Sequence, residues 1–201
     1  MDTEWTANLV QLYQHSLYFA TPASAKAASA SYNSIKTSWS AVSGASGYEI
    51  YRSTSKTGTY SLVKSTTATT FTNTSLSTNK TYYYKVRAYR MVGTKKIYSN
   101  FSTIVSAKPV PSIPANFKAA KYSSTSIKTS WSAVTGANGY QVYRATSKTG
   151  TYTLVKTTTS TSFTNTSLKT GKTYYYKVRA YRNVGSTKVY SGYTSILGVK
   201  L

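Results

Sequence analysis

The sequence predicts an all-β protein in which two tandem seven-stranded β-sandwiches are joined by a short proline-rich linker. Three observations predict this fold. The chain repeats itself at an offset of 92 residues, its apolar residues fall into short alternating runs, and clusters of Gly, Asn and Ser separate these runs. About seven strands at this spacing are typical of a β-sandwich.

The repeat defines the domains. Markers of the first copy recur in the second without a gap: Ile35, Trp39, Tyr48, Phe71, Leu76, Tyr82 and Tyr98 return as Ile127, Trp131, Tyr140, Phe163, Leu168, Tyr174 and Tyr190. A copy of this size buries roughly 60 to 70% of its unfolded surface, so each is expected to fold alone. We predict an N-terminal extension (1–21), domain 1 (22–109), a linker (110–113) and domain 2 (114–201). Pro109, Pro111 and Pro114 favour a stiff, extended linker.

Alternating residues predict the strands of the first copy in order: 34–39, 47–52, 60–64, 69–76, 80–90 and a last strand within 95–108. Gly58 precedes the third of these and is expected to supply a turn with positive φ. The sequences MVGTKK (91–96) and NVGSTK (183–188) each contain a glycine and predict hairpin turns.

The segment KTYYYKVRAYR occurs at 80–90 and, unchanged, at 172–182. Alternation divides it into two faces. We expect Tyr82, Tyr84, Val86 and Ala88 to face the core. The outward face is expected to carry Tyr83, Lys85, Arg87 and Tyr89, with Tyr175, Lys177, Arg179 and Tyr181 in the second copy, and Tyr51 and Tyr143 from the neighbouring strand.

This outward face has two interpretations. Its tyrosines could stack sugar rings or bases while the cations bind phosphate or carboxylate, which would make it a ligand-binding site. Alternatively, the tyrosines pair across strands and stabilise the sheet by roughly 0.2–1 kcal/mol per pair. Glu49 is expected to neutralise Lys85 or Arg87, whereas the second copy has Gln141, so its face should be the more electropositive.

Composition argues against catalysis. The chain has 25 Lys and Arg against 3 Asp and Glu, one His, no Cys and a net charge of +22. General acid–base chemistry and zinc or calcium sites need His, Cys or carboxylates, and none follows Glu49. We therefore expect no catalytic residue, no metal site and no cofactor. No apolar run is long enough to span a membrane, and the N-terminus lacks the features of a signal peptide.

Residues 1–21 lie outside the repeats. Trp5, Leu9, Leu12 and Tyr13 could form one face of a short helix, with Asp2 and Glu4 at its start. His15 lies beside this pattern and is expected to be solvated.

Several of these residues together resemble the fibronectin type III family, over about 180 of the 201 residues. The resemblance rests on a Trp in the second strand (Trp39, Trp131), a Tyr beginning the third (Tyr48, Tyr140) and a Leu six residues before a Tyr. It implies an immunoglobulin-like sandwich in which the hydroxyls of Tyr82 and Tyr174 bind nearby backbone. Lys80 and Lys172 depart from the family, which often has Thr there. The amino-acid sequence of the two copies is similar to that of domains repeated in surface and secreted proteins of Gram-positive bacteria.

The function expected is that of a non-catalytic, extracellular or cell-surface interaction module. It would be a monomeric, stiff, basic spacer of a larger bacterial protein and would dock to anionic cell-wall polymers or other polyanions. One alternative is a specific acidic-polysaccharide-binding accessory module of a secreted enzyme or adhesin. A second is non-specific nucleic-acid binding through charge, which salt dependence alone does not separate from the first.

Overall fold

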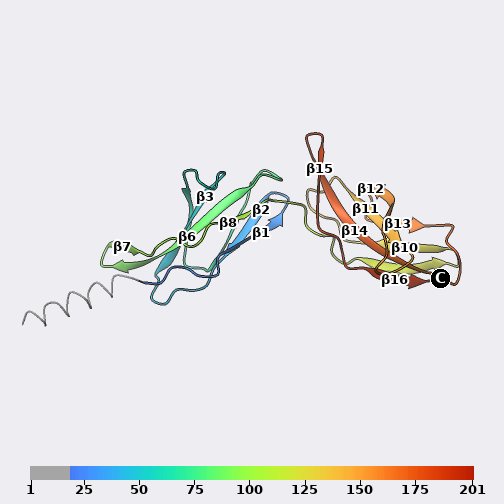
Figure 1. Cartoon of the computed structure of the whole chain (residues 1–201), viewed down its shortest axis with the longest axis horizontal. Coiled ribbons are helices and arrows are strands. Elements are labelled where there is room, and N and C mark those ends of the chain that lie inside the picture. Colours follow the sequence, from blue (N-terminus) through green and yellow to red (C-terminus); the bar gives the residue numbers. More distant parts are fainter. Residues whose placement is uncertain (1–18) are drawn as a thin grey trace, which may run out of the picture. The chain divides into compact units, whose positions relative to one another are not determined.

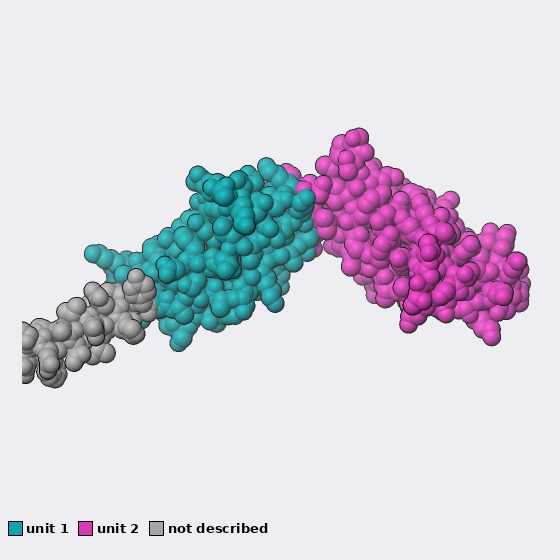
Figure 2. Space-filling view, viewed as in Figure 1, with its two compact units in different colours: residues 1–29, 34–76, 80–108 teal, residues 30–33, 77–79, 109–201 magenta. Residues whose placement is uncertain are grey.

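The computed structural model describes residues 19–201, which form two compact units (Figure 2). Unit 1 contains the described residues through Ser29 together with 34–76 and 80–108, and unit 2 contains 30–33, 77–79 and 109–201. The predicted helix face of Trp5, Leu9, Leu12 and Tyr13, with Asp2, Glu4 and His15, lies outside the described residues. The all-β prediction is confirmed, since the chain forms two β-sandwiches of two sheets each.

The strands follow one another in the same order in both copies (Figure 1). The first copy has β1 (Lys26–Ser31), β2 (Ser34–Ser38), β3 (Gly47–Ser53), β4 (Ser61–Thr66), β5 (Thr70–Asn73), β6 (Tyr82–Val92), β7 (Lys95–Tyr98) and β8 (Val105–Ala107). The second has β9 (Lys118–Ser123), β10 (Ser126–Ser130), β11 (Gly139–Ala145), β12 (Thr153–Thr158), β13 (Ser162–Asn165), β14 (Thr173–Val184), β15 (Thr187–Tyr190) and β16 (Leu197–Lys200).

Each sandwich packs a three-stranded sheet against a five-stranded one. The sheets of the first copy run β1-β2-β5 and β4-β3-β6-β7, with β8 also paired to β6. Those of the second run β13-β10-β9 and β12-β11-β14-β15, with β16 paired to β14. The long strands β6 and β14 therefore lie at the centre of the larger sheets, and they contain most of the repeated eleven-residue segment.

Each copy has eight strands, whereas the sequence predicted about seven and six were given ranges; one of the two additional strands arises because the last predicted strand is divided into β7 and β8. Between β7 and β8 the hydroxyls of Ser99 and Ser102 accept hydrogen bonds from the backbone amides of Ala88 and Val86, at 2.9 and 3.0 Å. Serine oxygens here replace the carbonyls that a continuous strand would offer, so β6 keeps its amides paired while the chain leaves the ladder. The sequence reading also assigned no strand at β1.

The alternation predicted for the repeated segment is confirmed on its inward side. Tyr84 and Ala88 of β6 are completely buried, as are Tyr176 and Ala180 of β14. The Tyr84 hydroxyl donates to Asn73 Oδ1 at 3.0 Å and Tyr176 donates to Asn165 Oδ1 at 2.9 Å, so each buried phenol has a partner. Burial raises the pKa of Tyr176 to about 12, although the nearby Arg144 opposes this.

Two further tyrosines fix the loops that lead into β14 and into β3. The Tyr174 hydroxyl accepts a hydrogen bond from the amide of Lys169 at 2.9 Å, which is the backbone contact that the family resemblance implies. The Tyr48 hydroxyl accepts one from the amide of Val42 at 2.9 Å. Trp39 packs edge-on against Tyr48 with ring centroids 5.5 Å apart, which joins this loop to the core.

The structure confirms the predicted hairpin turns at Gly93 and Gly185 but not the conformation predicted for Gly58. Gly93 and Gly185 have φ of 60° and 59° in the loops that join β6 to β7 and β14 to β15, so both predicted hairpins form. The expectation of positive φ at Gly58 is wrong, since its φ lies outside that region. Close packing instead favours glycine at position 58, because an added Cβ would lie 3.0 Å from Ser55 Cβ and 3.3 Å from Ser53 Oγ.

We expect Gly139→Ala to destabilise unit 2 by roughly 1–3 kcal/mol. A Cβ there would lie 2.6 Å from the Tyr181 hydroxyl oxygen and 2.8 Å from the Thr158 carbonyl oxygen, and the backbone atom cannot move aside cheaply. Gly47→Ala is the matched control, because the three atoms nearest to its Cβ all belong to the half-buried side chain of Tyr89 and none is a backbone atom. Hydrogen exchange of β14 and β6 amides in the intact chain measures both, and a larger effect at Gly47 would contradict this account.

Candidate functional site

The candidate site is the outward face of the larger sheet. In unit 1, β3 pairs with β6 so that Glu49 lies opposite Arg87 and Tyr51 lies opposite Lys85. Tyr89 and Tyr83 lie opposite Gly47 and Ser53 at the two ends of the same face. Unit 2 repeats this register between β11 and β14, pairing Gln141 with Arg179, Tyr143 with Lys177, Gly139 with Tyr181 and Ala145 with Tyr175. The structure therefore places all ten predicted site residues on these two faces.

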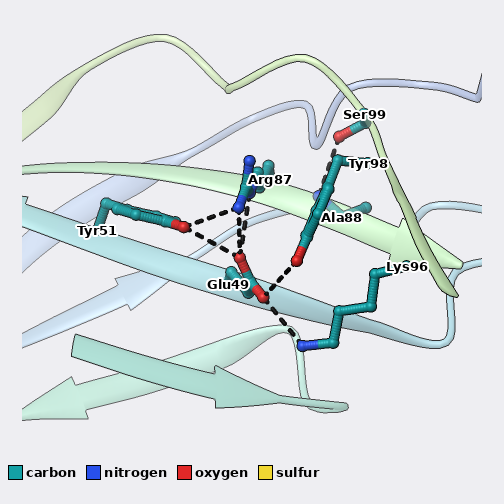
Figure 3. Close-up of polar contacts among 7 residues, drawn as sticks. All are labelled: Glu49, Tyr51, Arg87, Ala88, Lys96, Tyr98 and Ser99. Atoms are coloured by element: carbon teal, nitrogen blue, oxygen red, sulfur yellow. Dashed lines mark hydrogen bonds and ion pairs between the residues drawn. The ribbon is translucent and has the colours of Figure 1, made fainter. Parts of the chain in front are cut away.

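Glu49 is the centre of the face in unit 1 (Figure 3). Its Oε2 accepts hydrogen bonds from Arg87 Nε and Nη2 at 3.1 and 2.8 Å and from the Tyr51 hydroxyl at 3.1 Å. Its Oε1 accepts from Lys96 Nζ at 3.0 Å and from the Tyr98 hydroxyl at 3.2 Å. Glu49 is only 3% exposed, so this carboxylate is a buried anion held by two cations and two phenols.

The surroundings of Glu49 decide its ionisation. Burial raises the pKa of the Glu49 carboxyl, but hydrogen bonds from Arg87, Lys96 and Tyr51 lower it by more, so the net pKa lies below the ordinary value of 4.5. The hydrogen bond to Glu49 raises the pKa of Lys96, which burial opposes. The expectation that Glu49 pairs with Arg87 is met, whereas the partner of its other oxygen is Lys96 and not Lys85.

Unit 1 should lose stability in acid through this one group. A carboxyl whose folded pKa is depressed stabilises the fold above its unfolded pKa, and that contribution disappears as the pH falls through the folded pKa. We therefore expect the urea midpoint of unit 1 to fall below about pH 4.5, and Glu49→Gln to flatten this dependence. Urea titrations from neutral pH downward test this, and equal slopes for the two proteins would contradict it.

Unit 2 keeps the geometry of this network but not its charge. Gln141 Oε1 accepts from Arg179 Nε and Nη2 at 3.0 and 2.8 Å and from the Tyr143 hydroxyl at 3.0 Å. It therefore takes the role of Glu49 Oε2. Because its other terminal atom is an amide nitrogen, Gln141 offers no second acceptor to Lys188 and Tyr190, the counterparts of Lys96 and Tyr98.

Cations cover aromatic rings on both faces. The guanidinium carbon of Arg87 lies 3.6 Å from the ring centroid of Tyr98, and that of Arg179 lies 3.7 Å from Tyr190. Lys85 Nζ lies 4.1 Å from the Phe101 centroid, and Lys177 Nζ lies 4.2 Å from that of Tyr193. These contacts hold the cations in place and give each a cation–π contribution.

Three of the remaining predicted tyrosines, Tyr89, Tyr175 and Tyr181, have packing roles. Tyr89 and Tyr181 lie over Gly47 and Gly139, and each also packs edge-on against a β7 or β15 tyrosine at a centroid distance of 6.4 Å. Tyr175 lies over Gly198 of β16. These rings border the polar network and take no part in the hydrogen bonds described for Glu49 and Gln141.

Sequence reasoning missed the residues that approach this face from the loops before β4 and β12, from β7 and β15, and from the segments after β7 and β15. They are Tyr60, Lys96, Tyr98 and Phe101 in unit 1, with Tyr152, Lys188, Tyr190 and Tyr193 in unit 2. All but the Phe101–Tyr193 pair are identical at the 92-residue offset, which is a signal that could have found them. Within residues 19–201 there is no group of three or more His, Cys, Asp or Glu that could hold a metal. The same residues contain no helix that is long and apolar enough to span a membrane.

Comparison with known proteins identifies the units. The family profile for the fibronectin type III domain matches residues 112–195, and the first copy repeats that sequence 92 positions earlier. The two units are fibronectin type III domains. A two-domain fibronectin type III segment of chicken tenascin aligns with 89% of this chain and 99% of its own, at a TM-score of 0.46 and 18% identity.

Segments of two bacterial proteins named as enzymes are similar to this chain. Exoglucanase B of Cellulomonas fimi is 32% identical over 185 residues, which cover 84% of this chain and 16% of the enzyme. Chitinase A1 of Niallia circulans is 28% identical over 189 residues, which cover 88% of this chain and 25% of the enzyme. The chain thus spans a quarter or less of the length of these relatives.

Proposed function

We propose that the two domains form a non-catalytic, extracellular accessory module of a larger bacterial protein, and that they dock it to anionic polymers such as those of the cell wall. The observation that carries this proposal is the outward face of each larger sheet. There, Lys and Arg side chains are fixed above aromatic rings, and Glu49 of unit 1 is the one carboxylate on the two faces, with none on the face of unit 2. A net charge of +22 attracts polyanions at low salt and supports the same function.

The similar proteins support the accessory role. Exoglucanase B, chitinase A1 and an alpha-amylase are enzymes by name, and this chain matches only 16%, 25% and 8% of their lengths. Catalysis in the larger protein would then belong to another domain. The present domains would keep that domain near its polymer and act as a spacer.

Cosedimentation of the full chain with insoluble wall material tests this function. Walls that retain their anionic polymers should bind the chain, whereas the same walls stripped of them, and a neutral insoluble glucan, should not. Binding should fall steeply between about 50 and 200 mM salt, because each neutralised charge releases a counterion. Equal binding to stripped walls or to the neutral glucan would overturn the proposal.

A further inference from the structure

The network of unit 1 shows what these side chains are built to hold. An Arg, a Lys and two Tyr hydroxyls converge on the two oxygens of Glu49, each within 3.2 Å. This is a complete shell for one carboxylate, with cations on both oxygens. The carboxylate comes from the chain itself, so the charges of Arg87 and Lys96 are already compensated.

Unit 2 repeats this frame without its anion. Gln141 satisfies Arg179 and Tyr143 but carries no charge, and no Asp or Glu follows Glu49 anywhere in the sequence. Lys188 is exposed and lies 4.6 Å from the ring centroid of Tyr181, beside the position where its counterpart meets the carboxylate. Arg179, Lys188 and Lys177 therefore form a cationic group on one sheet face with no carboxylate to neutralise it.

A second difference between the copies lies at the same place. Phe101 of unit 1 corresponds to Tyr193 of unit 2, which is 36% exposed and packs edge-on against Tyr143 at a centroid distance of 5.3 Å. Its hydroxyl adds a neutral hydrogen-bonding group beside Lys177 and Arg179. Gln141 in place of Glu49 leaves the cations of unit 2 uncompensated, and Tyr193 in place of Phe101 adds a hydroxyl. The face of unit 2 therefore offers both charge and a hydroxyl group to an external ligand.

The positions of the cations indicate which polyanion fits. Arg179 lies over the ring of Tyr190, Lys188 over Tyr181, and Lys177 over Tyr193 and Tyr152. A ring face covered by a cation is not open to a stacking base, which is the main sequence-tolerant contact of single-stranded nucleic acid. Carboxylates and hydroxyls, in contrast, match the donors that this face presents.

We infer that the face of unit 2 formed by Gln141, Tyr143, Lys177, Arg179, Lys188 and Tyr193 is a binding site for carboxylate-bearing polysaccharide, and that Glu49 blocks the equivalent face of unit 1. This inference rests on the proposed function, because it names the ligand class and the domain that binds it. Gln141→Glu would recreate the internal carboxylate of unit 1 and close the site. Glu49→Gln would open a second site, and Gln141 shows that the frame accommodates glutamine.

The test measures binding of the full chain to polygalacturonate by calorimetry. We expect Gln141→Glu to weaken binding about tenfold, equivalent to ~1.4 kcal/mol. Ala120→Glu is the matched control, since it makes the same change of net charge at an exposed position of β9 in the other sheet of unit 2, and it should weaken binding less than about twofold. The double variant E49Q/Q141E keeps the net charge of +22 and should transfer ligand-induced hydrogen-exchange protection from β14 and β15 to β6 and β7.

The outcomes separate this inference from the proposed function. If the wild-type chain binds walls and polygalacturonate, but Gln141→Glu and Ala120→Glu weaken binding equally, charge alone accounts for docking and the inference is overturned. The inference is also overturned if single-stranded DNA of equal charge competes for the chain as effectively as polygalacturonate does. If the wild-type chain binds no polyanion at low salt, the proposed function fails as well.

Discussion

Replacing Arg87 by leucine should destabilise unit 1 by about 3 kcal/mol, because it leaves a buried carboxylate without its main partner. Arg87 supplies two of the hydrogen bonds to Glu49, whose side chain is 4% exposed. This loss is at the low end of the range usual for breaking a buried ion pair, because Lys96 and two tyrosine hydroxyls still donate to the carboxylate. Hydrogen exchange of β6 amides in the intact chain measures the unfolding free energy of this unit.

Arg179→Leu in unit 2 is the internal control for this variant. It removes the same guanidinium from the same register position, but it leaves a neutral amide in place of an anion. The loss should therefore be about 1 kcal/mol, as for an ordinary hydrogen bond. The double variant E49Q/R87L should resemble Arg179→Leu. Equal losses for Arg87→Leu and Arg179→Leu would show that the charge of Glu49 contributes nothing.

Trp131→Ala should destabilise unit 2 by roughly 3–5 kcal/mol, because it removes the largest side chain of a well-packed core. Trp131 is 5% exposed and packs edge-on against Tyr140 with centroids 5.4 Å apart. Its indole Nε1 is buried and has no hydrogen-bond partner among the described residues. Trp131→Phe should therefore destabilise the unit much less than Trp131→Ala, since it keeps an aromatic ring while removing an unsatisfied donor.

Exchange of β14 amides distinguishes these two variants, and β6 amides of unit 1 serve as the reference in the same sample. If Trp131→Phe is as harmful as Trp131→Ala, the indole nitrogen has a partner, such as a water molecule, that stabilises the native state. If both variants are nearly neutral, Trp131 does not anchor the core and this account of the fold is wrong.

The sequence predicted the parts of the fold that depend on period and repetition. Strict alternation in KTYYYKVRAYR separated Tyr84 and Val86 from Lys85 and Arg87, because successive side chains of a strand must point to opposite faces. The division of the last strand into β7 and β8 was not predicted. It depends on the Ser99 and Ser102 hydroxyls accepting hydrogen bonds from β6 amides, and serine is common in many loops of this chain.

The sequence predicted the residues of the candidate site that lie along β3 and β6, but not those that reach it from β7 and the segment after β7. Residues along β6 and β3 follow from alternation, so Tyr51, Lys85 and Arg87 were found. Lys96 and Tyr98 reach Glu49 only through the β6–β7 hairpin, and Phe101 reaches Lys85 from the segment after β7. Which residue of a neighbouring strand faces a given charge depends on register, and register depends on the two-residue Gly93 turn.

The missing carboxylates of unit 2 have one more consequence. Residues 114–201 contain no Asp, Glu, His or Cys. The ordinary pKa values of the other ionisable side chain types in this segment, Tyr, Lys and Arg, are about 10 or above. The side-chain charge of this domain is therefore constant from strong acid to mild alkali. Any pH dependence in what it binds would report the ionisation of the ligand. A carboxylated polymer would detach as it protonates near pH 4, whereas a phosphodiester polymer would stay bound.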